Sequence, residues 1–180
     1  MALGATIYTF AIALADADRG VYADFELKAA RHPSESEEYL VTRVLAYCLE
    51  YAEGIAFSRG ISDPDEPPLA VRDLTGALDS WIEIGAPDAA RLHKAAKAAP
   101  RVALYTHKDP AALQRQYAGE RIHRSEALEL YALDRELVAA LAKRLERRMK
   151  LEVSVSGAHL YVTAGGAMLH GEVARFTAAE

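Results

Sequence analysis

The feature that most constrains the fold is a change of hydrophobic period along the chain. Residues 5–14 and 21–28 carry bulky apolar side chains at alternate positions, and residues 151–155 near the other end do the same. A period of two is typical of β-strands that bury one face. Between these ends, helical patterns alternate with short apolar runs. The pattern therefore predicts a mixed α/β chain (α+β class) whose two ends are strands.

The two ends are predicted to meet in one additional antiparallel sheet. Turn residues at 16–20 join the first two strands into a hairpin, and Ser156-Gly157 and Gly165-Gly166 separate three strands near the C-terminus. An isolated hairpin is barely stable in water, so neither end is expected to bury its apolar face alone.

The middle of the chain is predicted to alternate strands with helices. The expected helices are residues 36–52, 88–99, 110–117 and 135–149, and the expected strands are residues 55–58, 78–84, 102–106 and 128–133. Such alternation requires a parallel or mixed sheet with helical crossovers.

Length, charge and cysteine content exclude several classes of protein. A chain of 180 residues, 51% of them hydrophobic, is expected to form a single domain over residues 1–180. The net charge of −5 means that contact with phosphates would need a local basic patch or a bound metal. The only cysteine, Cys48, excludes an intrachain disulfide framework and a CxxC zinc site.

The apolar N-terminal stretch is predicted to be a strand rather than a signal peptide. No Lys or Arg precedes Arg19, and a secretory signal normally begins with positive charge. No apolar run is long enough to span a membrane. We therefore expect a cytoplasmic protein without a membrane anchor.

Acidic residues in apolar surroundings are the best candidates for a functional site. Glu83 lies in the apolar run 78–84, with Asp79 on the same face. A buried acid is costly unless it is paired or binds a cation. Glu38 lies at the edge of the apolar face of helix 36–52, where it is either a solvated surface residue or turned toward the sheet. These acids are candidates for a metal site.

Basic residues follow the acidic strand. Arg91, Lys94 and Lys97 recur at three-residue spacing on one face of helix 88–99. The common interpretation of such a face is a solvated surface. The alternative is that a lysine here reaches back toward the end of the acidic strand.

At this point the motifs resemble those of the YaeQ family along the whole chain. The matching segments are Ala30-Arg-His-Pro-Ser-Glu35, Phe57-Ser-Arg-Gly60, Asp65-Glu-Pro67, Trp81-Ile-Glu-Ile-Gly85 and Pro87-Asp88, followed by the helix with Arg91 and Lys94. The resemblance implies a core like that of the PD-(D/E)XK restriction-endonuclease superfamily, of order αβββαβ, with the antiparallel sheet from the chain ends added to it.

The resemblance also implies a Mg²⁺- or Mn²⁺-dependent nuclease that hydrolyses phosphodiesters. Glu38, Asp79 and Glu83 would hold the metal, and Lys94 would act in catalysis with Asp79 and Glu83. Gly85 stands where the (D/E)XK element of that superfamily has its lysine, so Lys94 would be a migrated replacement. Arg59 and Arg91 would contact phosphate, which makes nucleic acid the expected partner.

Two alternatives to a nuclease remain open. The chain is either a catalytically degenerate fold that binds protein or nucleic acid, or an enzyme acting on a small phosphorylated molecule. Metal binding at the acidic residues separates the nuclease from the binding module.

Overall fold

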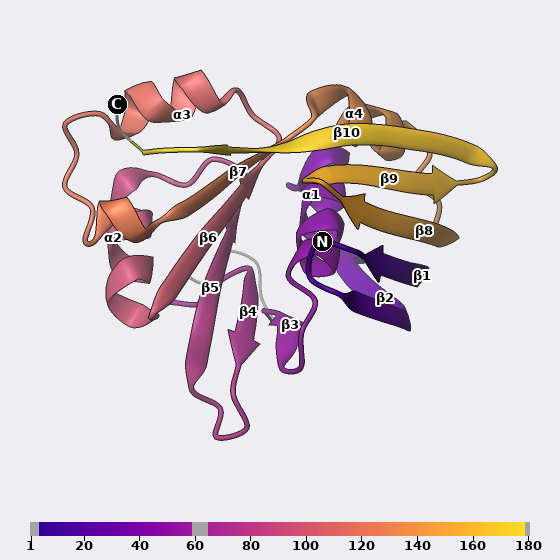
Figure 1. The fold of residues 1–180 in the computed structure, drawn as a ribbon, viewed down its shortest axis with the longest axis horizontal. Helices are drawn as coiled ribbons and strands as arrows, with labels where there is room; N and C mark the ends of the chain where they lie inside the picture. The colour runs from indigo at the N-terminus through magenta and orange to yellow at the C-terminus, as the bar shows by residue number, and fades with distance from the viewer. Residues whose placement is uncertain (1–3, 59–64, 179–180) are drawn as a thin grey trace. The chain divides into compact units, whose positions relative to one another are not determined.

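In the computed structural model, residues 4–58 and 65–178 are described, and they divide into two compact units. The first unit combines residues 1–49 with 133–173, and the second combines residues 50–132 with 174–180. Each unit therefore uses two separate stretches of the chain. Figure 1 shows the elements of both.

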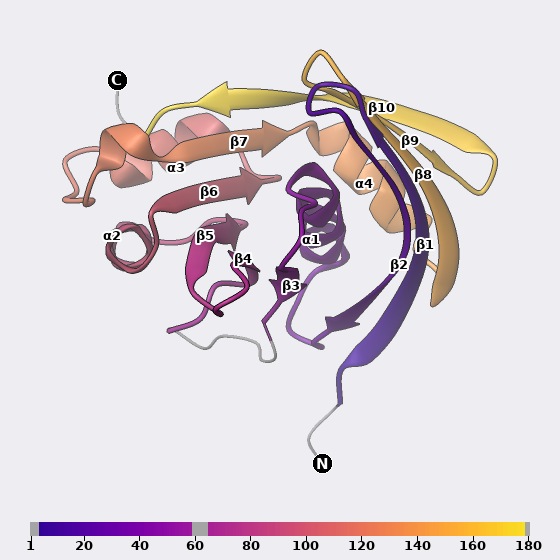
Figure 2. The same ribbon diagram turned by 60° about the horizontal axis from the view of Figure 1, so that its bottom comes forward.

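The first unit contains two helices and five strands, and the last of these strands, Ala167–Phe176, continues past Val173 into the second unit. The strand order is β2-β1-β8-β9-β10. The strands are β1 (Thr6–Asp16), β2 (Val21–Arg31), β8 (Arg148–Ser156), β9 (His159–Ala164) and β10 (Ala167–Phe176), and the helices are α1 (Glu37–Leu49) and α4 (Arg135–Lys143). Figure 2 shows α1 and α4 on the same concave face of this sheet.

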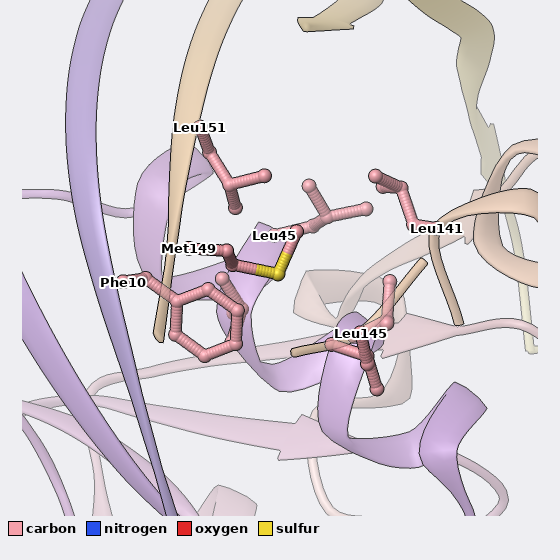
Figure 3. A pocket seen from close by; sticks show the side chains of 8 residues that line it. Phe10, Leu45, Leu141, Leu145, Met149 and Leu151 are labelled. Atoms are coloured by element: carbon pink, nitrogen blue, oxygen red, sulfur yellow. The ribbon is translucent and has the colours of Figure 1, made fainter. Parts of the chain in front are cut away.

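An apolar core fills the space between these helices and the sheet. Phe10 of β1 and Leu151 of β8 meet α1 at Leu45 and α4 at Leu141 (Figure 3). The eight side chains around this point, all apolar, leave a cavity of only about 10 Å³. A cavity of this size is at the limit for one water molecule, so the core is not a ligand site.

The second unit is also a five-stranded sheet. The strand order is β7-β6-β5-β4-β3, with β5, β6 and β7 parallel and β3, β4 and β5 antiparallel. The strands are β3 (Ile55–Phe57), β4 (Leu69–Arg72), β5 (Leu78–Ile84), β6 (Arg101–Thr106) and β7 (Glu129–Leu133); the helices are α2 (Ala89–Ala98), α3 (Pro110–Tyr117) and the 3₁₀ turn Ser125–Ala127. The two α-helices pack on the Trp81 face of β5–β7, around Leu92, Leu104 and Leu113.

The prediction of an αβββαβ core with an added antiparallel sheet was wrong. The helix expected to open that core, α1, belongs to the first unit, whereas β3, β4, β5, α2 and β6 belong to the second. The chain ends do share a sheet, but β1 runs parallel to β8, so the sheet is mixed rather than antiparallel. Periodicity shows that a helix buries one face; it does not show which sheet covers that face.

The prediction of a helix over residues 135–149 was also wrong at its end. Helix α4 ends at Lys143, and β8 begins at Arg148. The intervening sequence is rich in residues that favour helices, but residues 148–150 pair with β1 in parallel register. Tertiary pairing overrides the local preference here, and the residues between α4 and β8 become surface.

None of the helices in the described part of the chain combines the length and apolarity that a membrane crossing requires.

Candidate functional site

Glu83 is the most buried of the predicted site residues. It lies in β5 of the second unit with 4% of its surface exposed. Trp81 Nε1 donates a hydrogen bond to Glu83 Oε2 at 2.6 Å, and Arg91 Nε donates to both carboxylate oxygens at 3.1 Å. Arg91 also stacks over the Trp81 ring, with 5.5 Å between Cζ and the ring centroid. The carboxylate is therefore paired inside its own unit.

The chain between β5 and α2 brings Arg91 to this carboxylate. Gly85 has φ +87°, a left-handed conformation that a residue with a side chain rarely adopts. A lysine at position 85 would therefore be strained. Asp88 then caps α2 by accepting a hydrogen bond from the backbone N–H of Arg91 at 2.8 Å.

Burial dominates the electrostatics of Glu83. Desolvation raises its pKa above the ordinary value, whereas the Trp81 hydrogen bond and the Arg91 charge act in the opposite direction. The nearby Tyr117 hydroxyl donates to the Pro87 carbonyl at 2.7 Å. Burial, together with the charge of Glu83, raises the pKa of Tyr117. A perturbed acid beside a specific cation is consistent with either a functional site or a structural ion pair.

Lys94, predicted to be catalytic, pairs with an acid that the sequence interpretation had not selected. Its ammonium group contacts the carboxylate of Asp65, and both side chains are largely exposed. Arg91, one turn earlier, donates from Nη2 to the Glu66 carbonyl at 2.8 Å. The Asp65-Glu-Pro67 motif thus lies against α2. In the sequence, nothing marked Asp65 as a site residue except its place in a motif shared with the family.

The other predicted site residues are Asp79, Glu38 and Arg59. Asp79 is exposed near the start of β5, and four residues of extended strand separate it from Glu83 by about 13 Å. Glu38 is a half-buried residue in the first turn of α1, which belongs to the first unit. Arg59 lies outside the described residues.

The geometry around Glu83 does not fit a Mg²⁺ ion. Mg²⁺ requires oxygen ligands at about 2.0–2.1 Å in near-octahedral geometry, and the Arg91 guanidinium holds the place beside both Glu83 oxygens. Among residues 4–58 and 65–178, no three or more His, Cys, Asp or Glu side chains gather as metal ligands would. The ligand roles of Glu38, Asp79 and Glu83 stay predictions.

Millimolar Mg²⁺ is therefore expected to leave the melting temperature of the wild-type protein unchanged. An ion that bound only the native state would raise it by mass action. Thermal unfolding followed by circular dichroism, with and without Mg²⁺, measures this for wild type, Glu83→Gln and the surface control Glu120→Gln, which removes an exposed acid from the same unit. A rise in wild type that disappears only in Glu83→Gln would contradict the expectation and identify Glu83 as a ligand.

A second buried cluster of charged residues lies on the opposite face of the same sheet. Arg101 of β6 donates to both oxygens of Glu50 at 2.7 and 2.9 Å, and to Glu129 of β7 at 2.6 and 3.2 Å. The hydroxyl groups of Tyr105 and Tyr131 donate to Glu50 and Glu129, at 2.6 and 2.8 Å. The guanidinium thus lies between two acids, each of which also accepts from a tyrosine.

The Arg101 cluster is self-contained. Hydrogen bonding to Arg101 holds the pKa of Glu129 below its ordinary value, and burial, reinforced by Glu50, raises that of Tyr105. A carboxylate paired in this way is a poor general base near neutral pH. We interpret the cluster as the structural connection between β6, β7 and Glu50, which lies in the segment leading to β3. The sequence interpretation missed it because its hydrogen-bonded partners are up to 55 positions apart.

The basic residues 143–150, called here the basic segment, were also missed. Five of its eight residues are cations, Lys143, Arg144, Arg147, Arg148 and Lys150, and all five are exposed. Among the described residues, none of the five forms an ion pair. The charge run itself was a visible signal, but the incorrect helix over residues 135–149 made it look like an ordinary solvated helix face.

Two hollows open beside the basic segment in the first unit. One, of about 430 Å³, is lined by the cations Lys143, Arg144 and Lys150. The other, of about 440 Å³, is lined by Arg147, Arg148 and Lys28 of β2. Each hollow therefore presents three cations, and Glu146 is the one acid that lines either of them.

Comparison with known proteins gives consistent matches. The family model described as YaeQ protein matches residues 1–173. The protein named "Uncharacterized protein YaeQ" from Escherichia coli K12 is 36% identical over 165 residues, and that from Salmonella typhi is 35% identical over 164; each match covers 91% of both chains.

Solved structures give the same result. The crystal structure of YaeQ protein from Pseudomonas syringae matches with a TM-score of 0.87 at 33% identity, covering 96% of both chains. YaeQ protein from Xanthomonas axonopodis pv. citri matches with a TM-score of 0.82 at 28% identity, covering 96% of this chain and 98% of that one.

Proposed function

Since the chain belongs to the YaeQ family, whose matching curated members are named only as uncharacterized, we propose a function from its own surface: it binds the phosphate backbone of nucleic acid through the basic segment. The observation that carries the proposal is the concentration of exposed cations in residues 143–150, with no ion-pair partner among the described residues.

The charge of the basic segment contrasts with that of the whole chain. Its five cations and one acid give a net charge of +4 within eight residues, whereas the chain carries −5. An acidic protein repels polyanions over most of its surface, so a local basic patch both attracts and orients an anionic partner. This is the local patch that contact with phosphates requires in a chain of negative net charge.

The side-chain chemistry suits phosphate groups. A guanidinium group presents N–H donors in a planar fork that matches phosphate oxygens, and lysine adds a mobile point charge. Arg148 and Lys150 are both exposed and lie two residues apart in β8, which places them on the same face of the strand about 7 Å apart. Lys28 extends this face to β2, because Thr9 of β1 pairs with both Lys28 and Arg148.

The arrangement of the cations favours a polymer over a small phosphorylated molecule. Sites for small ligands are concave, mostly apolar and enclose most of the ligand. Here six cations are divided between two separate open hollows, three in each, so neither hollow encloses a single ligand among all of them. A chain of regularly spaced phosphates would engage both hollows at once.

Neutralising three of these cations is expected to weaken binding of nucleic acid at least about tenfold at ~0.1 M salt. The test variant combines Lys143→Gln, Arg148→Gln and Lys150→Gln. Each lost phosphate contact lowers the slope of log affinity against log salt by about 0.9, so the slope should fall by up to ~2.7. Fluorescence anisotropy with labelled single-stranded DNA, duplex DNA and RNA measures both quantities.

The matched control removes the same number of charges from exposed positions in the other unit. It combines Lys108→Gln, Arg115→Gln and Arg121→Gln and is expected to weaken binding less than threefold. If both variants lost the same affinity, the loss would follow from the change in net charge alone, and the basic segment would be rejected as the binding site. Absence of binding by the wild type to any of the three nucleic acids at low salt would reject the function itself.

Hydrolysis of the bound nucleic acid is the second candidate. In its favour, two acids, Asp65 and Glu83, and two cations, Arg91 and Lys94, gather along α2. Against it, Glu83 is already paired and does not fit Mg²⁺ in the described geometry. We therefore propose binding without cleavage, and the Mg²⁺ experiment above distinguishes the two.

A further inference from the structure

Two histidines meet on the outer face of the hairpin formed by β9 and β10. His159 pairs in register with Glu172, and His170 pairs with Tyr161, so the two histidines are diagonal neighbours on adjacent strands. His170 is exposed and His159 half-buried, whereas the alternate residues Leu160 and Val162 are completely buried. The imidazole rings therefore project from the sheet on the side away from its core.

The ring nitrogens converge on one another. His159 Nε2 lies 3.3 Å from His170 Nδ1, and the ring centroids are 5.5 Å apart with 29° between the ring planes. Without a metal, this distance corresponds to a hydrogen bond in which one nitrogen donates and the other accepts. With both nitrogens deprotonated, each would have a lone pair available to a metal ion.

The spacing matches that of two imidazole ligands on a single zinc ion. Zn–N bonds are about 2.0–2.1 Å long, and two such bonds ending on nitrogens 3.3 Å apart enclose an angle of about 107°. A regular tetrahedron requires about 109°, the geometry that Zn²⁺ adopts in most protein sites. The observed separation of the two nitrogens thus suits two ligands of one tetrahedral ion.

We propose that His159 and His170 bind a divalent transition-metal ion of the Zn²⁺ class at the surface of the first unit. Imidazole nitrogen is a ligand that Zn²⁺, Cu²⁺ and Ni²⁺ prefer, whereas Mg²⁺ prefers hard oxygen ligands. Within the described residues, no third His, Cys, Asp or Glu completes the set, so water or another molecule fills the remaining positions. The site is therefore open and exchanges its metal readily.

The ion would link the two strands across the hairpin. The backbone at Gly165 and Gly166, which join β9 to β10, is in the left-handed region at both positions. A metal bridge between His159, at the start of β9, and His170, inside β10, would connect the two strands away from that turn. This role requires neither the phosphate-binding function of the basic segment nor a metal at Glu83.

The test is isothermal titration of EDTA-treated protein with Zn²⁺ in a buffer without phosphate. The wild type is expected to bind one ion through the pair, and His159→Gln or His170→Gln alone should weaken binding at least tenfold. The double variant should lose the site. Zn²⁺ should also raise the melting temperature of the wild type but not of the double variant, because only the native state presents both ligands.

The control variant is His123→Gln, which removes an exposed histidine from the second unit and should bind Zn²⁺ as the wild type does. Mg²⁺ should give no heat with any of these proteins. Retention of Zn²⁺ binding by the double variant would overturn the proposal, because the ion would then be held elsewhere. Absence of Zn²⁺ binding by the wild type at submillimolar concentration would overturn it as well.

Discussion

Replacing Trp81 with alanine is expected to lower the free energy of unfolding by about 4 kcal/mol, since large-to-small changes of buried aromatic residues typically cost about 3–5 kcal/mol. Trp81 has 1% of its surface exposed and packs in the core of the second unit with Leu92, Leu104 and Leu130. Alanine would leave a cavity there, and it would also remove the donor from Glu83. Such a loss is a large part of the ~5–15 kcal/mol that stabilises a typical native protein.

Two further variants separate packing from hydrogen bonding. Trp81→Phe keeps an aromatic ring but removes the indole donor, whereas Arg91 still donates to both Glu83 oxygens. The variant therefore loses one hydrogen bond to a charged group, which typically contributes about 1.5–3 kcal/mol. The surface control Leu74→Ala changes a side chain that is 92% exposed, so its effect should stay within about 0.5 kcal/mol. Urea unfolding must be followed by circular dichroism rather than by tryptophan fluorescence, because these variants remove the only tryptophan, Trp81. A loss below ~1 kcal/mol for Trp81→Ala would contradict the buried position of this side chain.

Replacing Arg101 with methionine is expected to lower the free energy of unfolding by about 2–4 kcal/mol. Removing one partner of a buried ion pair typically costs about 3–5 kcal/mol, because the other charge remains buried without compensation. Glu50 would be that charge, with 8% of its surface exposed. The lower range applies because a third of the Arg101 side chain is exposed, and solvent screens the part of the pairing that lies there.

A second substitution tests the cause of this loss. Adding Glu50→Gln to Arg101→Met removes the uncompensated charge, so the double variant should be more stable than the sum of the single effects predicts. Simple additivity would show that Arg101 stabilises the unit through packing alone. The exposed residue Arg135 provides the control, since Arg135→Met should change stability by less than about 0.5 kcal/mol.

The stabilising effect of Arg101 should also depend on pH in a defined direction. Pairing with Arg101 lowers the pKa of Glu129 below 4.5, so the unfolded state binds more protons than the native state just below that pH. This contribution is complete above pH 4.5 and is lost as the pH falls toward the lowered pKa. The difference in stability between wild type and Arg101→Met should therefore shrink below that pH.

Local pattern in the sequence determined the type of most elements and the family. Strand 78–84 and helix 110–117 were predicted at their observed bounds, and the period-two segments at both ends are strands. Alternation and helical spacing arise from the geometry of a single strand or helix, so a single sequence contains them. The unusual burial of Glu83 was visible for the same reason, because an acid inside an apolar strand is costly wherever that strand packs.

Only the tertiary structure decided which residues contact one another across different strands and helices. The sequence left Glu83 with two explanations, an ion pair or a metal, and the position of α2 beside β5 provides Arg91. Likewise, only the pairing of β8 with β1 ends the predicted helix early and turns residues 143–150 into an exposed basic surface. His159 and His170 come together only through the register of a hairpin. In each case the deciding contact joins residues from different strands or helices, and the spacing of such residues along the chain follows no helical or strand period. Packing energy, rather than local preference, therefore selects the contact.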